Sequence, residues 1–415
     1  MLKKPRGTRD YSSEEMEKRR YIEQNMRLTF QTFGYKEIQT PTFEHLELFT
    51  AKSGEAIIDE LYSFTDKGGR NLALRPELTA PVIRFYIDKL QMEAKPLKLF
   101  YFGNCYRYDR PQKGRYREFK QAGCEIIGTN TSEAYAELIA MAYKILQKTG
   151  LKNLELKIGN LDLLYSIFKK FNLKKDQQKY LTPLIDKSQF EEVFDALTDF
   201  GIKNKDASLL TDLLQTKQLK EIEKYINDDN SKKELEKFKE ILKYLRESFR
   251  IKEYNISLAI VRGLDYYKGI VFEIDAPLLG AEKQICGGGA YELISLFKGS
   301  DVPTAGFAIG FDRTILALEK EKYTFKTKNL DFFVIPFNKD LIKKSLEITS
   351  NLRKQGFLVD IDLLRRGLSK SLKYADSINA KKVIIVAPDE LKRDCVTIRD
   401  MITGNQEILN INKLK

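Results

Sequence analysis

The sequence contains no tryptophan, one histidine and only four cysteines in 415 residues. Because the one histidine is His45, a histidine-rich metal site is excluded and a Ser-His-Asp triad is disfavoured. The cysteines are Cys105, Cys124, Cys286 and Cys395. They lie far apart with no C-x-x-C pair, which argues against a zinc site and a disulfide framework. Any chemistry must therefore be carried by arginine, acids, amides, tyrosine and threonine.

Long apolar runs are also absent. No stretch approaches the roughly 18 apolar residues that a membrane-spanning helix requires. The N-terminal stretch MLKKPRGTRDYSSEE lacks the apolar segment of a secretory signal. We therefore expect no membrane partner and a cytoplasmic location. The hydrophobic content of 42% is still sufficient to form the cores of about two or three domains.

Acidic residues are in the minority. The 71 Lys and Arg residues outnumber the 59 Asp and Glu residues, which gives a formal net charge of +12. Such an excess favours a polyanionic partner, although charge alone does not separate nucleic acid from a membrane surface. A solvated basic surface without a partner remains the alternative.

The order of the predicted elements indicates an α/β fold. A capping box at residues 12–15 begins a long helix that ends before Gly34. The segment 35–44 has the pattern of one strand interrupted by Pro41. A short hairpin is predicted about Gly68 and Gly69, and a long antiparallel hairpin over residues 97–128.

Two later segments differ in character from the first part of the chain. Residues from about 161 to 250 are rich in Lys, Leu, Asp and Glu and have helical periodicity, which predicts a helical insertion. After a Lys-rich linker, strand and helix patterns alternate as β-α-β-α-β from residue 330. This pattern predicts a second, small α/β domain with a parallel or mixed sheet.

The long hairpin carries polar side chains in alternation. Because alternate side chains of a strand share a face, Arg107 and Asp109 are predicted on one face of its first arm. Phe119, Gln121 and Glu125 share a face of the second arm. Such a set can hold an anion, stack a planar base, and receive an amine or a ring N–H. A solvent-facing polar sheet explains this hairpin equally well.

Four other short stretches carry candidate ligand-binding residues. Glu77 and Thr79 precede a predicted helix and suit an ammonium group, although helix capping explains them as well. The glycines of CGGGAYE, residues 286–292, allow a close approach to the backbone but lack P-loop spacing. Arg313 lies at a strand-to-helix junction, where a surface salt bridge is the ordinary explanation. In IVRGLDYYKGIVFEI, residues 260–274, a cation and two phenols between strand-like runs indicate a pocket wall.

Taken together and in order, these stretches resemble the histidyl-tRNA synthetases, which are class II aminoacyl-tRNA synthetases. The resemblance rests on PRGTRDY (5–11), RPELTAP (75–81), the motif 2 hairpin YRYDRPQKGRYREFKQAGCEIIG (106–128), RGLDYY (262–267) and the motif 3 stretch AGFAIGFDR (305–313). It implies a catalytic domain over residues 1–325 with a mostly antiparallel sheet and an insertion at about 161–250. It also implies an anticodon-binding α/β domain over residues 326–415.

The resemblance implies a role for each motif residue. The catalytic residues would be Arg262 and Arg107, which contact the reacting carboxylate and the α-phosphate. Histidine would be bound by Glu77, Thr79, Gln121, Glu125, Tyr266, Tyr267 and Tyr291. ATP would be bound by Arg107, Asp109, Phe119, Arg262 and Arg313. Arg110 and Gln112 in the motif 2 loop would contact tRNA.

The implied reaction is activation of L-histidine by ATP to histidyl-adenylate and pyrophosphate, followed by transfer to the 3′ end of tRNA(His). Mg²⁺ would accompany ATP, with its protein ligands left open. The Pro41 segment resembles motif 1 and implies a homodimer. Asp109, Asp312 and Ala290 stand where relatives commonly have Glu, Glu and Arg. These departures concern adenine and metal geometry more than the class of reaction.

Two other interpretations remain open. One is a regulatory, histidyl-tRNA synthetase-like subunit of ATP phosphoribosyltransferase, which generally lacks the anticodon domain and has lost pocket motifs. This chain has the segment predicted to form the anticodon domain, and its pocket motifs are intact. The other is a non-enzymatic basic RNA-binding protein, which would explain the charge but not the arginine, tyrosine and glutamine residues of the motifs.

Overall fold

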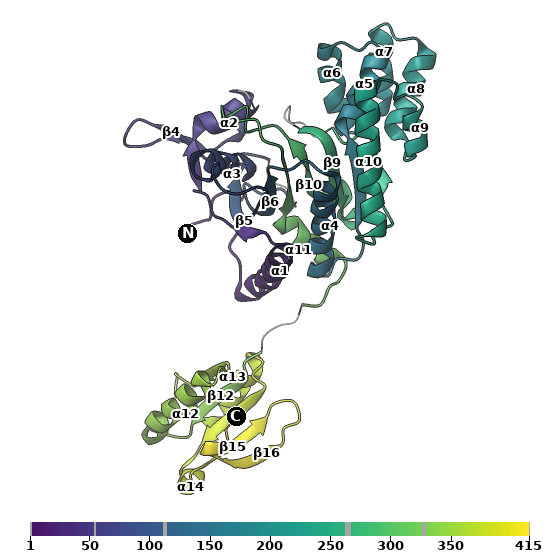
Figure 1. The fold of residues 1–415 in the computed structure, drawn as a ribbon. Helices are drawn as coiled ribbons and strands as arrows, with labels where there is room; N and C mark the ends of the chain where they lie inside the picture. Colours follow the sequence, from purple (N-terminus) through teal and green to yellow (C-terminus); the bar gives the residue numbers. More distant parts are fainter. Residues whose placement is uncertain (1, 54, 111–113, 262–266, 326–328, 415) are drawn as a thin grey trace. The chain divides into compact units, whose positions relative to one another are not determined.

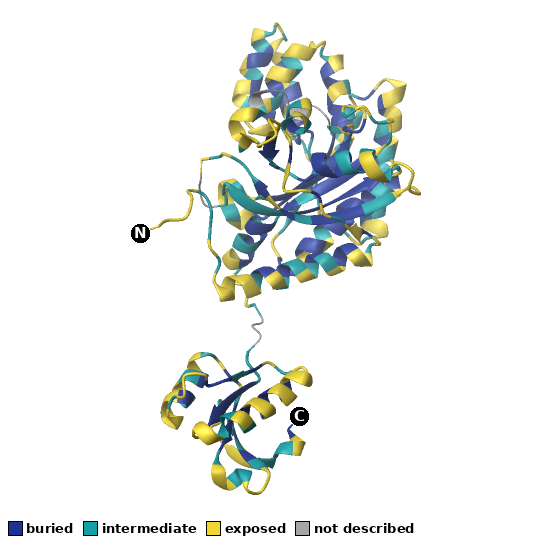
Figure 2. Cartoon of the chain, turned by 90° about the vertical axis from the view of Figure 1, so that its left-hand side faces the viewer, coloured by how far each residue is buried: buried dark blue, intermediate teal, exposed yellow. Residues whose placement is uncertain are grey.

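The computed structural model describes residues 2–53, 55–110, 114–261, 267–325 and 329–414 (Figure 1). The chain forms two compact units, Met1–Phe325 and Lys326–Lys415. In both units the central strands are largely buried and the helices expose one side to solvent (Figure 2). Within these described ranges, no helix has both the length and the apolar character needed to cross a membrane.

An eight-stranded sheet forms the centre of the N-terminal unit. Its strands are β1 (Lys36–Glu37), β5 (Leu97–Tyr106), β6 (Glu118–Ile127), β7 (Glu155–Asn160), β8 (Asn255–Ile256), β9 (Tyr267–Asp275), β10 (Gln284–Tyr291) and β11 (Thr304–Gly310). Their order is β1-β5-β6-β11-β10-β9-β7-β8. Only the outermost pairs, β1 with β5 and β7 with β8, are parallel. The expected mostly antiparallel α/β fold is therefore confirmed.

The helices α1 (Ser13–Thr32), α4 (Ser132–Thr149) and α11 (Phe311–Lys320) pack against the large sheet. The predicted capping box begins α1, since Glu15 N donates to Ser12 Oγ at 3.2 Å and Ser12 N to Glu15 Oε2 at 2.7 Å. On its buried face, the Phe30 ring stacks on Phe100 of β5 with centroids 4.9 Å apart. Helix α1 therefore packs directly against the sheet.

A second, three-stranded sheet is formed within residues 43–74. It contains β2 (Phe43–His45), β4 (Asn71–Leu74) and β3 (Ser63–Thr65) in that order, and the predicted hairpin about Gly68 and Gly69 joins the last two. The helices α2 (Leu46–Ser53) and α3 (Thr79–Phe85) accompany it, with two short turns, η1 (Glu55–Glu60) and η2 (Tyr86–Leu90).

The prediction of a single strand over residues 35–44 is wrong. The segment forms β1 in the large sheet and β2 in the small one, separated by Pro41. Proline has no N–H to continue a strand ladder. The buried Arg75 guanidinium occupies the break, where Nη1 donates to the carbonyls of Thr40 at 2.8 Å and Pro41 at 3.0 Å. This arginine therefore links the two sheets.

Six helices form residues 161–247: α5 (Leu161–Lys170), α6 (Lys175–Asp186), α7 (Phe190–Asp199), α8 (Asn204–Gln215), α9 (Leu219–Glu223) and α10 (Asp229–Glu247). In Figure 1 they form one group at the edge of the large sheet. Helix α10 packs on α4 and α5. Buried residues such as Phe168 and Leu245 belong to the same apolar cluster as the sheet, so this part is continuous with the main core.

The C-terminal unit has a five-stranded mixed sheet in the order β13-β12-β14-β15-β16. Its elements are β12 (Phe332–Pro336), η4 (Lys339–Leu341), α12 (Ile342–Lys354), β13 (Val359–Ile361), α13 (Leu368–Ser377), β14 (Lys382–Val386), α14 (Pro388–Leu391), β15 (Cys395–Asp400), β16 (Gln406–Asn410) and η5 (Ile411–Lys413). Alternate residues of β12 point to opposite faces. Val334 packs with Ile348 of α12, and Phe333 with Ala375 of α13, so helices cover both faces.

One buried carboxylate joins three segments of the N-terminal unit. Asp312, at the start of α11, accepts from Arg9 Nη2 at 2.7 Å and from Arg19 Nη1 at 2.6 Å through Oδ1. Its other oxygen accepts the backbone N–H of Lys120 in β6 at 2.8 Å. The PRGTRDY stretch, helix α1 and the long hairpin are therefore held together at one point.

Replacing Asp312 with alanine should destabilise the protein by about 3 kcal/mol, because two guanidinium groups lose a buried counter-ion. Urea unfolding measures the change. Asp10→Ala is the matched control, since the Asp10 side chain is 89% exposed and lies 3.9 Å from Lys4, whereas the Asp312 side chain is 5% exposed. Equal unfolding midpoints for the two variants would contradict the anchoring role of Asp312.

Candidate active site

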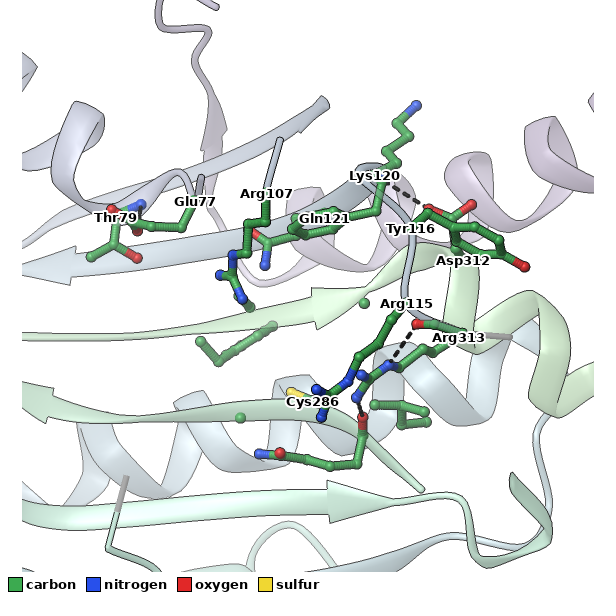
Figure 3. A pocket seen from close by; sticks show the side chains of 18 of the residues that line it. Glu77, Thr79, Arg107, Arg115, Tyr116, Lys120, Gln121, Cys286, Asp312 and Arg313 are labelled. Carbon is green, nitrogen blue, oxygen red and sulfur yellow. Dashed lines mark hydrogen bonds between the residues drawn. The ribbon is translucent and has the colours of Figure 1, made fainter. Parts of the chain in front are cut away.

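A cavity of about 530 Å³ lies against the large sheet. The predicted residues that line it are Glu77, Thr79, Arg107, Asp109, Phe119, Gln121, Glu125, Tyr267, Tyr291 and Arg313. Figure 3 shows Glu77 and Thr79 at one end, Arg313 and Arg115 at the other, and Arg107 between them. Arg262, Tyr266 and Gln112 lie outside the described residues, and Arg110 is exposed. The structure therefore brings together ten predicted residues from distant motifs.

The long hairpin contributes side chains from its second strand and from the end of its first strand to the cavity. Phe119, Gln121 and Glu125 alternate along β6 and all line the cavity, as predicted. The placement of Arg107 and Asp109 on a strand face is wrong, because β5 ends at Tyr106. Arg107 nevertheless lines the cavity, since its Nε donates to the carbonyl of Pro76 at 2.9 Å.

The deep end of the cavity contains a buried acid between two phenols. The Glu125 residue is 1% exposed. Tyr101 donates its hydroxyl to Oε1 at 2.8 Å, and Tyr291 donates to Oε2 at 2.5 Å. Burial raises the pKa of Glu125 to about 8, although hydrogen bonds from Tyr291, Tyr101 and Thr79 oppose the rise. Hydrogen bonds to both oxygens therefore orient this carboxyl group, and its raised pKa brings its protonation close to neutral pH.

A glycine makes room for this acid. Gly306 of β11 pairs directly with Glu125 of β6. A Cβ atom at Gly306 would lie 1.8 Å from Glu125 Oε2 and 2.4 Å from the carbonyl oxygen of Cys124. Any other residue would therefore displace the carboxylate or the strand.

Tyr101 is a site residue that the sequence analysis missed. It pairs with Gly123 across β5 and β6, and a Cβ at Gly123 would lie 2.7 Å from its hydroxyl oxygen. The available signal was the glycine on the same face of β6 as Gln121 and Glu125. A missing side chain at that position leaves space for a large cross-strand neighbour.

Glu77, and not Thr79, caps helix α3, since Thr79 is its first residue and Glu77 lies before it. Its Oε2 accepts the N–H of Thr79 at 2.7 Å, and its Oε1 accepts the N–H of Ala80 at 3.1 Å, both in the first turn of α3. Glu77 and Thr79 also line the cavity, so capping and ligand binding are compatible. Gln121 Oε1 accepts from the Cys105 thiol at 3.3 Å, which orients the amide.

Arginines line the middle and the other end of the cavity. The Arg107 guanidinium lies 5.3 Å from the centroid of the Phe119 ring. Arg313 donates Nε to the carbonyl of Gly114 at 3.2 Å and Nη1 to that of Gln284 at 2.8 Å. Burial lowers the pKa of Arg313; Glu282 opposes this shift, whereas Arg115 and Arg107 add to it. Repelling cations at one end of a cavity favour an anionic ligand.

The structure offers no protein cage for a metal ion in its described part. No group of three or more His, Cys, Asp or Glu side chains with suitable placement occurs among those residues. Asp312 already accepts from two arginines and a backbone N–H. We therefore assign no metal ligand.

Glu125→Gln should change how stability depends on pH. The carboxyl pKa is 4.5 in its reference state and about 8 in the folded protein, so the folded state binds more protons between these values. The free energy of unfolding contributed by this group therefore falls as pH rises through that window. The variant should lose this part of the decline, as measured by urea unfolding between about pH 5 and 8. The exposed Glu17→Gln variant is the control, and identical slopes in all three proteins would contradict the assignment.

Comparison with known proteins covers the whole chain. The family model "Histidyl-tRNA synthetase" matches residues 7–314, and "Anticodon binding domain" matches residues 331–415. The histidine-tRNA ligase of Methanocaldococcus jannaschii is 44% identical over 423 residues, which span 100% of this chain and 99% of that protein. That of Methanosarcina acetivorans is 42% identical and spans 100% and 97%.

A solved structure shares the fold. The apo histidyl-tRNA synthetase of S. aureus has a TM-score of 0.78 at 32% identity, covering 100% of this chain and 98% of that one. The resemblance predicted from the motifs is thus confirmed by sequence and by fold. The chain belongs to the histidyl-tRNA synthetase family of class II aminoacyl-tRNA synthetases and is, by its full-length relatives, a histidine-tRNA ligase.

Proposed function

We propose that the cavity binds L-histidine at its Glu125 end and ATP at its Arg313 end, so that the carboxylate and the α-phosphate meet beside Arg107. The observation that carries this proposal is the arrangement in one cavity of a buried acid held by two phenols and a separate group of arginines. The product would be histidyl-adenylate, from which histidine passes to the 3′ end of tRNA(His).

At the histidine end, Glu125 would bind an imidazole N–H and Tyr267 would contact the other ring nitrogen. Tyr101 and Tyr291 hold the carboxylate in place. Burial keeps the pKa of both phenols well above the usual value, so they remain donors. A side chain without ring nitrogens would leave the remaining acceptor capacity of this buried acid unsatisfied, which is a basis for rejection.

The substrate ammonium would lie near Glu77, Thr79 and Gln121, which supply acceptor oxygens along the same cavity. The proposed contact to the substrate carboxylate is Arg262, and Tyr266 is proposed as a second wall of the histidine pocket. Both assignments rest on the RGLDYY motif, because these residues are outside the described ranges.

At the ATP end, Arg107 would contact the α-phosphate and Phe119 would stack on adenine. Arg313 would cover the other face of the base and reach the γ-phosphate, and Asp109 would approach the adenine edge. Attack of a carboxylate on phosphorus brings two anions together. Positioning and fixed cations are therefore the main requirements, and no covalent nucleophile is needed.

Mg²⁺ would enter with ATP and be bound mainly through the phosphate oxygens, because the described residues form no group of three or more His, Cys, Asp or Glu that could hold the ion. When bound, the ion would neutralise charge on the departing pyrophosphate.

The C-terminal unit is proposed to bind the tRNA anticodon. Residues 326–415 contain 18 Lys and Arg against 11 Asp and Glu. Phe337 follows β12 and is 56% exposed, and Leu363 follows β13 and is 75% exposed. Exposed apolar side chains beside cations such as Arg365 suit the stacking of unpaired bases. Arg110 and Gln112 would contact the same tRNA near the active site.

A homodimer is proposed through the small sheet. Phe43 of β2 and Phe64 of β3 are 52% and 44% exposed, and their ring centroids lie 6.3 Å apart. These strands adjoin the Pro41 segment. An exposed aromatic pair of this kind favours burial against a second copy.

We propose that the enzyme works in the cytoplasm.

Arg107→Ala should lower histidine-dependent exchange of pyrophosphate into ATP at least about 100-fold, because a fixed cation at the reacting phosphate is lost. Exposed Arg20→Ala makes the same change of charge and should leave exchange near that of the unmodified protein. An unmodified chain with no histidine-dependent exchange would overturn the proposed function and favour the regulatory-subunit alternative.

Removing residues 330–415 should lower tRNA charging far more than pyrophosphate exchange, because the anticodon contacts lie in the removed part. Both activities are measured on the same preparation, and circular dichroism checks that the remaining chain is folded. Equal losses of both activities in a folded protein would contradict the proposal that the C-terminal unit serves tRNA binding and not pyrophosphate exchange.

A further inference from the structure

A carboxylate lies between two arginines at the nucleotide end of the cavity. Glu282, the last residue of the short helical turn η3 (Pro277–Glu282), forms an ion pair with Arg313 Nη2. It also accepts from Arg115 Nε, with 3.1 Å between Nε and Oε1. The two arginines come from different elements, the loop of the long hairpin and the first turn of α11. Glu282 therefore links two parts of the chain at the arginine-lined end of the cavity.

Arg313 offers little room for a second anion in this arrangement. Its Nε and Nη1 donate to the carbonyls of Gly114 and Gln284, and its Nη2 bonds Glu282. Each of its three nitrogens thus has an acceptor. Arg115 is more open, since its side chain is 52% exposed. A phosphate group that bridges Arg115 Nε and Arg313 Nη2, the two donors that Glu282 holds, must take the position of its carboxylate.

The protein also has space to receive that carboxylate. A second hollow of about 560 Å³ shares Gly114 and Arg313 with the cavity, and Glu282 itself lies on its wall. The cation Lys320 and the acid Glu319 also line it. A turn of the Glu282 side chain would move its charge away from the arginines and toward this hollow.

We propose that Glu282 is an internal counter-ion that holds Arg115 and Arg313 in position and that the phosphate chain of the nucleotide displaces. Without an anion, the carboxylate limits repulsion between the two guanidinium groups. With the nucleotide bound, the same carboxylate opposes the phosphates, so it weakens their binding and favours release of pyrophosphate. This inference rests on the proposed function only in taking the anion to be the phosphate chain of ATP.

Glu282→Gln tests the proposal because glutamine keeps the size and loses the charge. Calorimetric titration with inorganic tripolyphosphate should show binding about 3- to 10-fold tighter than in the unmodified protein. In pyrophosphate exchange, KM for ATP should fall by a similar factor while KM for histidine stays unchanged. A role in folding alone would not produce this difference between the two KM values.

Two further variants serve as controls. Glu17→Gln makes the same change of net charge at an exposed position of α1 and should leave tripolyphosphate binding unchanged. Glu282→Asp keeps the charge and should bind within about two-fold of the unmodified protein. Equal tightening in Glu282→Asp and Glu282→Gln would overturn the proposal, because charge would not be the cause.

Unchanged or weaker binding of tripolyphosphate by folded Glu282→Gln would also overturn it. Weaker binding would mean that the carboxylate assists the phosphates, directly or through magnesium. The titration needs no histidine, tRNA or turnover. A failure of the proposed function, seen as absent histidine-dependent exchange, is therefore distinct from a failure of this inference.

Discussion

The register between β6 and β11 is the constraint on which the site depends. It pairs Glu125 with Gly306 and Gln121 with Gly310, so the polar face of the hairpin lies beside the strand that leads into α11. A shift of one residue would turn every side chain of β6 to the opposite face. Glu125 would then point into the apolar core, and no acid would lie at the deep end of the cavity. One strand pairing thus determines the chemistry of the end of the cavity that is proposed to bind histidine.

Arginines in this protein have different partners and therefore different roles. Arg75 donates to backbone carbonyls at the break between two strands, and Arg19 pairs with the buried Asp312. Arg107 and Arg313 are held by backbone carbonyls in a way that leaves their guanidinium groups on the cavity wall. Structural arginines support the shape of the site, and arginines on the wall supply its positive potential.

The three departures from the common family pattern have different consequences. Asp312 is an anchor for the N-terminal segment, so its short side chain serves packing between α11 and its neighbours. Ala290 is buried in β10 opposite Ala305, and no cation lies at that position. Asp109 and Asp312 both line the cavity, whereas Ala290 does not. Of the three changes, only the one at Ala290 therefore lies away from the cavity wall.

Much of the fold was predictable because it follows from local patterns. The capping box located the start of α1, and alternation along the hairpin placed Phe119, Gln121 and Glu125 on one face. Alternation failed at Arg107 and Asp109 because the strand ends earlier than its sequence pattern suggests. It failed again at residues 35–44, where the buried Arg75 separates two strands that the sequence shows as one.

The sequence by itself determined the types of the main elements, the family and the chemical character of the motif residues, since these depend on residue types and short spacings. Only the tertiary structure decided that Tyr101 supports Glu125, that Asp312 serves as an anchor and that Glu282 lies between Arg115 and Arg313. These pairs are separated by many residues along the chain. Their distances are set by strand pairing and helix packing, which no local pattern encodes.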